Sequence, residues 1–419
     1  MSNEVMRESS TTLHGQLQRG LGRAARRAAA SRGAGEYVYD CVRRDPRWDA
    51  QCEERGLYYA RLIVDLELPA GPLADHLFDP ADAAGSDADR GWLTLCVLGD
   101  LVRLSRRESA AILRRYAEDG THWSDALEIL ADLGDPSLTA GLDGLVAARC
   151  DEDDLFWLLR DPDNPVFASW AARQPRIAAA LSRNRDRTLV PRPAPGPAGL
   201  SLLPEDVLHA MASGRGDDAM PAIFELGRRR SPALLDLAEE FAPLRPSRWG
   251  GAVARALRGC GPRTVPRARI WAASPGSAHG LDALGLDILA RHGTRQDIPL
   301  LMTALDTALT GRAWGSAASP IEGLGRLRAG ESVPLLKSAW TESEYSYLRP
   351  RVLTALARTA PHTAEAFTTE GLWDAEEAVR EIAAQTAPRT PDTTTRLRRL
   401  HHDAAEDPGI RATAAARLL

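Results

Sequence analysis

Apolar residues recur along most of the chain at spacings of three and four positions, the pattern of amphipathic α-helices. Residues 57–66 carry such a stripe and end before Pro69, and residues 92–104 are apolar enough to be buried on all sides. Valine and isoleucine fall inside these helical periods, and no stretch shows the sustained alternation of a β-strand. The pattern therefore predicts an all-α protein.

Two interruptions divide the predicted helices. Between Leu13 and Gly35 there are five arginines and no acidic residue, so we expect residues 1–35 to form a basic flexible arm. Residues 190–199 contain four prolines and two glycines, which excludes a helix and predicts an extended linker over 190–200. The expected organisation is the arm, an N-terminal helical region over 36–189, the linker, and a repeat array over 201–419.

An internal period supports the array. Three segments align, at 348–356, 379–387 and 410–418. Each has an aliphatic residue followed by an arginine, and these arginines, Arg349, Arg380 and Arg411, are 31 residues apart in both intervals. A fixed period of this size is the signature of stacked helical hairpins, each of which buries its apolar face against its neighbours.

The earlier helix of each unit can also be traced. The run Val-Pro-Leu-Leu at 333–336 matches Ile-Pro-Leu-Leu at 298–301, and each follows a turn that contains glycine. Together with Val-Arg-x-x-Ala-Ala at 379–384, these runs resemble HEAT repeats, particularly the short bacterial kind found in phycobilisome-lyase-type proteins. The resemblance implies an α-solenoid of HEAT-like hairpins. It also implies that the repeated arginines bond locally within the stack, with a ladder of anion-binding arginines as the alternative. Whether 36–189 is a degenerate part of the same array stays open.

Composition narrows the function classes. The net charge is −5, and Lys337 is the only lysine beside 51 arginines, a usage typical of a GC-rich bacterial genome. No run of about 18 apolar residues occurs, so we expect no membrane association. The five cysteines are scattered, without a Cys-x-x-Cys pair, which favours buried thiols, Cys41 and Cys52 included, in a reducing cytoplasm.

The sequence indicates no particular reaction. No His-x-x-x-His pair, nucleophile elbow or Walker-type phosphate loop is present, so we expect no metal and no cofactor, and we identify no catalytic residue. Tryptophans beside carboxylates, such as Trp157 and Trp170 around Asp161 and Asp163, resemble an arrangement in alkylpurine DNA glycosylases of the AlkD type, which are also built of HEAT-like repeats. Those enzymes need a basic groove, and the negative net charge disfavours nucleic acid here.

We therefore expect a non-enzymatic, cytoplasmic scaffold that binds a protein or peptide partner on the concave surface of its repeats. The alternatives are an AlkD-like glycosylase or nucleic-acid-binding protein, and a lyase-type or chaperone-like subunit. Aromatic residues are frequent interface anchors. We expect part of the binding surface around one turn in the array, at Trp340, Glu342, Glu344, Tyr345 and Tyr347, with a core position for Trp340 as the alternative.

Overall fold

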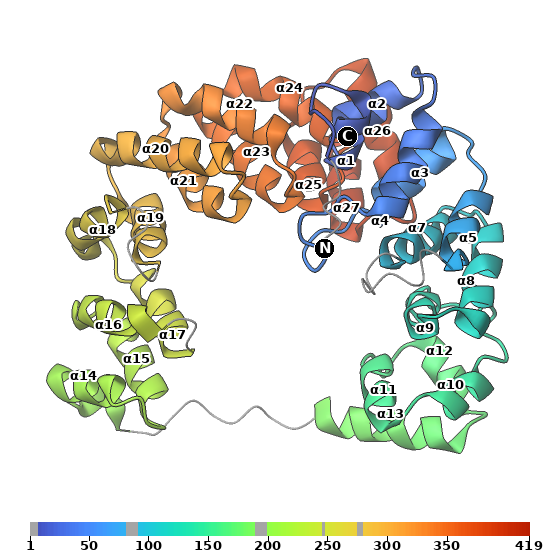
Figure 1. Ribbon diagram of the computed structural model, residues 1–419, viewed down its shortest axis with the longest axis horizontal. Helices are drawn as coiled ribbons and strands as arrows, with labels where there is room; N and C mark the ends of the chain where they lie inside the picture. Colours follow the sequence, from blue (N-terminus) through green and yellow to red (C-terminus); the bar gives the residue numbers. More distant parts are fainter. Residues whose placement is uncertain (1–6, 81–90, 189–198, 245–247, 275–279) are drawn as a thin grey trace. The chain divides into compact units, whose positions relative to one another are not determined.

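The computed structural model describes residues 7–80, 91–188, 199–244, 248–274 and 280–419, all of which form helices, turns or irregular segments (Figure 1). Within these ranges there is no β-strand, so the all-α prediction is confirmed. The chain divides into two compact units. The first unit comprises Met1–Arg192 and Thr368–Leu419, and the second comprises Pro193–Phe367.

The first unit contains the helices at both ends of the chain. Helices that follow one another pack side by side, as α8 does on α9, α12 on α13 and α26 on α27. The N-terminus of α26 is capped: Thr390 forms a capping box with Thr393, and Pro391 takes the first helical position, where no amide hydrogen is needed. The helices are α1 (Leu13–Gln18), α2 (Gly22–Ala28), α3 (Ala34–Arg44), α4 (Gly56–Asp65), α5 (Gly71–Leu77), α7 (Trp92–Arg103), α8 (Glu108–Asp119), α9 (Trp123–Asp132), α10 (Asp143–Arg149), α11 (Glu152–Leu158), α12 (Pro165–Ala171), α13 (Pro175–Thr188), α25 (Glu377–Thr386), α26 (Pro391–His402) and α27 (Pro408–Leu418).

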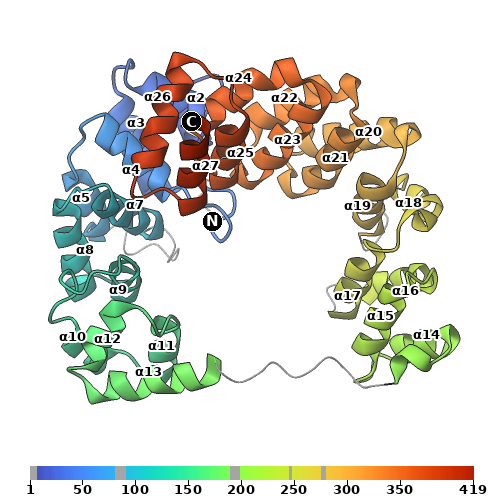
Figure 2. The same ribbon diagram turned by 180° about the vertical axis from the view of Figure 1, so that it is seen from behind.

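The expectation of a flexible arm over residues 1–35 is wrong for the described part of it. Leu17, Leu21 and Ala24 of this segment are completely buried, and both views of the chain show α2 beside α26 (Figures 1 and 2). Gly22 packs so closely on the backbone of Glu370 that a Cβ atom would lie 2.0 Å from its carbonyl oxygen. The apolar residues therefore form a buried stripe, which the abundance of arginine obscured in the sequence.

Acidic residues from the C-terminal segment pair with two of the three arginines of α2. Arg23 Nε lies 2.9 Å from Glu370 Oε1, and Arg26 Nη2 lies 2.8 Å from Asp392 Oδ2. The amide of Ala375 also donates to the carbonyl of Gly20 at 2.9 Å. Residues 368–419 therefore pack with the N-terminal helices, whereas the sequence grouped them with 201–367. The linker expected over 190–200 lies almost wholly outside the described residues.

In the second unit, helices pack as consecutive pairs. The pairs α18 with α19, α20 with α21 and α22 with α23 are each in contact, and α21 also contacts α19 and α23 (Figure 1). The helices are α14 (Glu205–Ser213), α15 (Ala219–Arg228), α16 (Ala233–Phe241), α17 (Arg248–Leu257), α18 (Val265–Ala272), α19 (Leu281–His292), α20 (Ile298–Thr310), α21 (Trp314–Leu327), α22 (Val333–Glu342) and α23 (Arg349–Thr359), and the division between the units falls within α24 (Pro361–Gly371).

Glycine allows the second helices of these pairs to approach one another. A Cβ atom on Gly325 of α21 would lie 2.7 Å from the Cα atom of Ala355 on α23. Two residues earlier, on another side of α21, a Cβ atom on Gly323 would lie 2.9 Å from the Cα atom of Ala290 on α19. Such distances are below ordinary van der Waals contact, so these positions exclude larger residues, and the helices form a row with little side-chain bulk between them.

Candidate functional site

Trp340, the aromatic residue around which the sequence placed a binding surface, belongs to the core. Its side chain is fully buried and makes an edge-to-face contact with Phe367, with 5.5 Å between the ring centroids. Leu336, four residues earlier on α22, is buried on the same face. Trp340 is therefore not a surface anchor, and its contribution is to the stability of the hairpin.

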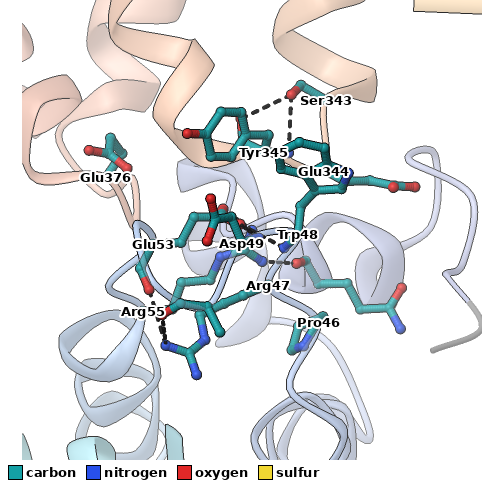
Figure 3. Close-up of polar contacts among 12 residues, drawn as sticks. Pro46, Arg47, Trp48, Asp49, Glu53, Arg55, Ser343, Glu344, Tyr345 and Glu376 are labelled. Atoms are coloured by element: carbon teal, nitrogen blue, oxygen red, sulfur yellow. Dashed lines mark hydrogen bonds and ion pairs between the residues drawn. The ribbon is translucent and has the colours of Figure 1, made fainter. Parts of the chain in front are cut away.

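The turn after α22 holds Glu344 and Tyr345 in fixed positions. Glu344 is 3% exposed and accepts hydrogen bonds from Arg312 Nη1 at 3.2 Å and Trp314 Nε1 at 3.4 Å. Ser343 Oγ donates to the carbonyl of Tyr345 at 2.9 Å and accepts from its amide at 3.2 Å (Figure 3). Glu344 thus ties the turn to the start of α21.

Tyr347 and Glu342 are the two exposed residues of the expected surface. The ring of Tyr347 is 44% exposed and lies 5.7 Å from that of Tyr345, measured between centroids. The guanidinium carbon of Arg351 lies 4.8 Å from the centroid of the Tyr347 ring, and Arg351 Nη1 donates to the Tyr347 carbonyl at 2.9 Å. Through Arg351, Tyr347 adjoins a groove that the sequence did not reveal.

This groove, which we call the arginine groove, lies across the second helices of three consecutive pairs, α19, α21 and α23. Its volume is about 590 Å³. The lining residues are Ala290, Arg291, Glu322, Gly325, Arg326, Pro350, Arg351, Thr354, Ala355 and Arg358. Small residues thus form part of the surface, and long charged side chains surround them. The close approach of α21 and α23 at Gly325 brings the arginines of both helices to one groove.

Positive charge dominates the arginine groove, with four arginines against the single carboxylate of Glu322. Arg351 Nε lies 2.8 Å from Glu322 Oε1, and Arg291 Nε lies 3.3 Å from Asp287 Oδ1. Arg358 is exposed and forms no ion pair with any described residue. After internal pairing, the groove therefore keeps an excess of positive charge that faces solvent.

Arg326 has a structural role in addition to its place in the groove. It donates to the carbonyls of Ala290 at 2.7 Å and Gly293 at 2.6 Å, which are acceptors left over at the C-terminal end of α19. Burial lowers the pKa of Arg326. Its guanidinium joins α21 to α19 and holds the two helices at the spacing that shapes the groove.

The aligned arginines of the repeat do not face the groove. Arg349 and Arg380 are buried, and Arg380 donates to both carboxylate oxygens of Glu406 at 2.8 Å and to the carbonyl of Ala375 at 2.7 Å. The prediction of a local structural role is thus confirmed for Arg380. The groove arginines follow a different register: Arg351 and Arg358 lie two and nine positions after Arg349, on one face of α23. The seven-residue spacing of Arg351 and Arg358 is therefore the feature of the sequence from which the groove could have been predicted.

A second hollow, of about 660 Å³, lies in the first unit and contains a histidine–carboxylate pair. His14 Nε2 lies 3.0 Å from Asp40 Oδ2, and the His14 ring stacks on Tyr37 at 4.9 Å between centroids. Among its described lining residues there is no serine, threonine, cysteine or lysine to act as a nucleophile. Cys41 follows Asp40 in the sequence but is not among the lining residues. Its burial raises the pKa of its thiol to about 12, which disfavours a thiolate nucleophile beside the hollow.

Cys52, expected as a buried thiol, is instead exposed. Nearby, Glu53 organises the loop before α4 by accepting from the amides of Trp48 at 2.6 Å and Asp49 at 2.9 Å, while Arg55 Nη2 lies 2.6 Å from Glu53 Oε2 (Figure 3). Glu53 and Arg55, two of the buried charges of this loop, are thus paired with each other.

Among the described residues, no helix is long and apolar enough to cross a membrane, and no group of three His, Cys, Asp or Glu side chains gathers as metal ligands would. The arginine groove and its surroundings are therefore the candidate functional site. Comparison of the chain with protein-family models, with curated proteins and with solved structures found no match.

Proposed function

We propose that the chain is a non-enzymatic scaffold of HEAT-like hairpins that binds an acidic segment of a protein partner in the arginine groove. The observation that carries the proposal is the convergence of four arginines and one carboxylate on the second helices of three stacked pairs. The 31-residue period and the pairwise packing support a solenoid, whose successive second helices form one continuous face.

The chemistry of the groove favours an extended acidic peptide. Arginine binds carboxylates through two parallel hydrogen bonds, and arginine and tyrosine are the residue types most often found at interface hot spots. Gly325 and Ala355 leave room for a peptide backbone between the charged side chains, and the exposed ring of Tyr347 adjoins one wall through Arg351. Glu322 would compete with the ligand for Arg351, which favours a partner with several acidic residues.

Charge reversal of Arg358 tests the proposal. Peptides selected by the native chain from a random displayed library should be rich in Asp and Glu. The affinity of a selected peptide should fall about tenfold or more for Arg358→Glu, because one favourable charge contact becomes repulsive. Arg295→Glu is the matched control, since Arg295 is equally exposed but lies outside the groove. Selected peptides without acidic enrichment, or equal binding by Arg358→Glu, would refute this function.

A second candidate, nucleic-acid binding, is favoured by the same excess of arginine. A glycosylase of the AlkD type would also need an aromatic residue beside the carboxylate, and the described lining of the groove contains no tryptophan. A labelled 20-base-pair duplex titrated at 50 and 200 mM salt separates the two candidates. Duplex binding that weakens steeply with salt, and that Arg358→Glu abolishes, would put nucleic acid in place of the peptide.

A further inference from the structure

Arg396 of α26 is a buried cation that forms no ion pair with a carboxylate of the described residues. Its side chain is 6% exposed. Arg396 Nε donates to the carbonyl of Leu372 at 3.0 Å, and its guanidinium carbon lies 5.3 Å from the centroid of the Trp373 ring. Its two Nη groups donate to no acceptor in the described residues. Burying an arginine charge is costly unless an opposite charge compensates it.

Of the carboxylates near Arg396, Glu406 and Asp403 are bound to other arginines, and Asp65 forms no ion pair with Arg396. Glu406 accepts from Arg380 Nη2 at 2.8 Å and from Arg61 Nη2 at 3.0 Å. Asp403 accepts from Arg61 Nη2 at 2.6 Å. Burial and the positive charges of Arg61 and Arg380 together lower the pKa of Arg396 to about 9. The protein thus places three cations close together and neutralises only two of them.

Arg396 lines a pocket of about 400 Å³ formed by the ends of α4, α7 and α26, all in the first unit. Three other arginines contribute to the wall, Arg61, Arg103 and Arg399, together with His402. Against them stand two carboxylates, of which Asp403 already pairs with Arg61 and the other, Asp65, is exposed. With histidine neutral, the lining residues carry an excess of two positive charges, and Arg103 is also paired at 2.8 Å with Asp100, which lies outside the lining.

We propose that this pocket binds the phosphate group of a small phosphate ester, with Arg396 as its innermost ligand. A phosphate monoester carries close to two negative charges at neutral pH, which matches the excess in the lining, and arginine forks bind phosphate through paired hydrogen bonds. A pocket of this volume falls within the range of small-molecule sites and exceeds the size of a bare phosphate ion. Val64 and Leu104 provide apolar wall for the organic part of the ester. The site is separate from the arginine groove and independent of the proposed scaffold function.

Calorimetric titration of the full chain with inorganic phosphate and with AMP, at constant ionic strength held with chloride, measures the site directly. Both probes should bind, and Arg396→Met should lose binding to both. Because Met fills similar space without a buried charge, this variant should unfold at a temperature at least as high as the native chain does without phosphate. Arg399→Gln changes an exposed residue and should weaken binding about tenfold without affecting folding. Arg398→Gln is the matched control, since Arg398 is the exposed neighbour outside the pocket.

The outcomes are distinct. Tighter binding of AMP than of phosphate supports an ester as ligand, and equal binding supports the phosphate group with free phosphate as its source. Absence of binding by both probes overturns the proposal, as does binding that survives unchanged in both Arg396→Met and Arg399→Gln. If Arg396→Met fails to fold, Arg399→Gln and Arg398→Gln decide the question by themselves.

Discussion

Glu406 is the residue whose removal should most clearly disturb the packing of the two chain ends. It is buried, and its carboxylate accepts from Arg380 on α25 and from Arg61 on α4, 345 residues away in the sequence. Its own oxygen also accepts from the amide of Asp407 at 3.0 Å. The substitution Glu406→Gln keeps the shape of the side chain and removes the charge that both arginines need.

The size of the effect follows from the pKa of Glu406. Burial would raise this pKa, but the charges of Arg380 and Arg61 and the hydrogen bonds they donate lower it from 4.5 to about 2. At 1.36 kcal/mol per pKa unit, this difference corresponds to about 3 kcal/mol of stability at neutral pH. Breaking buried ion pairs elsewhere costs about 3–5 kcal/mol, the same order of magnitude.

The sign of the pH dependence is also determined. A carboxyl group with a depressed pKa in the folded state contributes its stability above its unfolded pKa, here 4.5, and loses it as the pH falls towards about 2. The difference in unfolding free energy between the native chain and Glu406→Gln should therefore be largest at neutral pH. It should shrink progressively as the pH falls from about 5 to about 2.

Native-state hydrogen exchange of the amides in α25–α27, read by mass spectrometry at pH 7 and analysed for opening free energy, measures this local stability. Urea unfolding followed between pH 3 and pH 7 gives the pH dependence. Glu381→Gln is the control, because Glu381 lies on α25 but is exposed. If Glu406→Gln lowers the free energy of opening by less than about 1 kcal/mol at pH 7, the buried network does not stabilise the packing as described. The same conclusion follows if the loss does not shrink as the pH falls.

Four further substitutions test other parts of the structure. Gly325→Leu should destabilise the second unit by about 2 kcal/mol or more in urea unfolding and weaken peptide binding, because its side chain would collide with Ala355 across the α21–α23 contact. Gly22→Val should detach α1 and α2 and expose their arginines to trypsin, since the position has no room for a Cβ atom. Trp340→Ala should cost about 3–5 kcal/mol as a core truncation, whereas Tyr347→Ala should leave unfolding within about 0.5 kcal/mol and reduce peptide affinity.

Matched positions control for these changes. Gly330→Ala and Gly71→Ala introduce a Cβ atom where nothing lies within 4 Å, so both should leave stability and trypsin resistance nearly unchanged. Wild-type trypsin resistance in Gly22→Val would contradict the close packing at the N-terminus. Equal losses of stability in Trp340→Ala and Tyr347→Ala would contradict the distinction between core and surface on this hairpin.

The helical class and the pairing of helices could be read from the sequence because both depend on local order. The spacing of apolar residues sets which face of a helix is buried, and prolines and glycines set where helices end. Val333 and Pro334 begin α22, and Ile298 and Pro299 begin α20, as the aligned runs indicated. The local role expected for the repeated arginines is likewise seen at Arg380.

The sequence did not show which charged residues form ion pairs, because pairing depends on the distance in space between residues that are far apart in the chain. Arg23 bonds to Glu370 across 347 residues, so a segment that looks like a free basic arm is in fact packed and partly neutralised. The arginine groove likewise requires that Gly325 bring α21 and α23 together, and Arg396 forms no ion pair with Glu406 or Asp403 because Arg61 and Arg380 bind these carboxylates. Local periodicity specifies the helices, whereas the electrostatic character of each surface arises only when the packed helices place particular side chains within a few ångströms of one another.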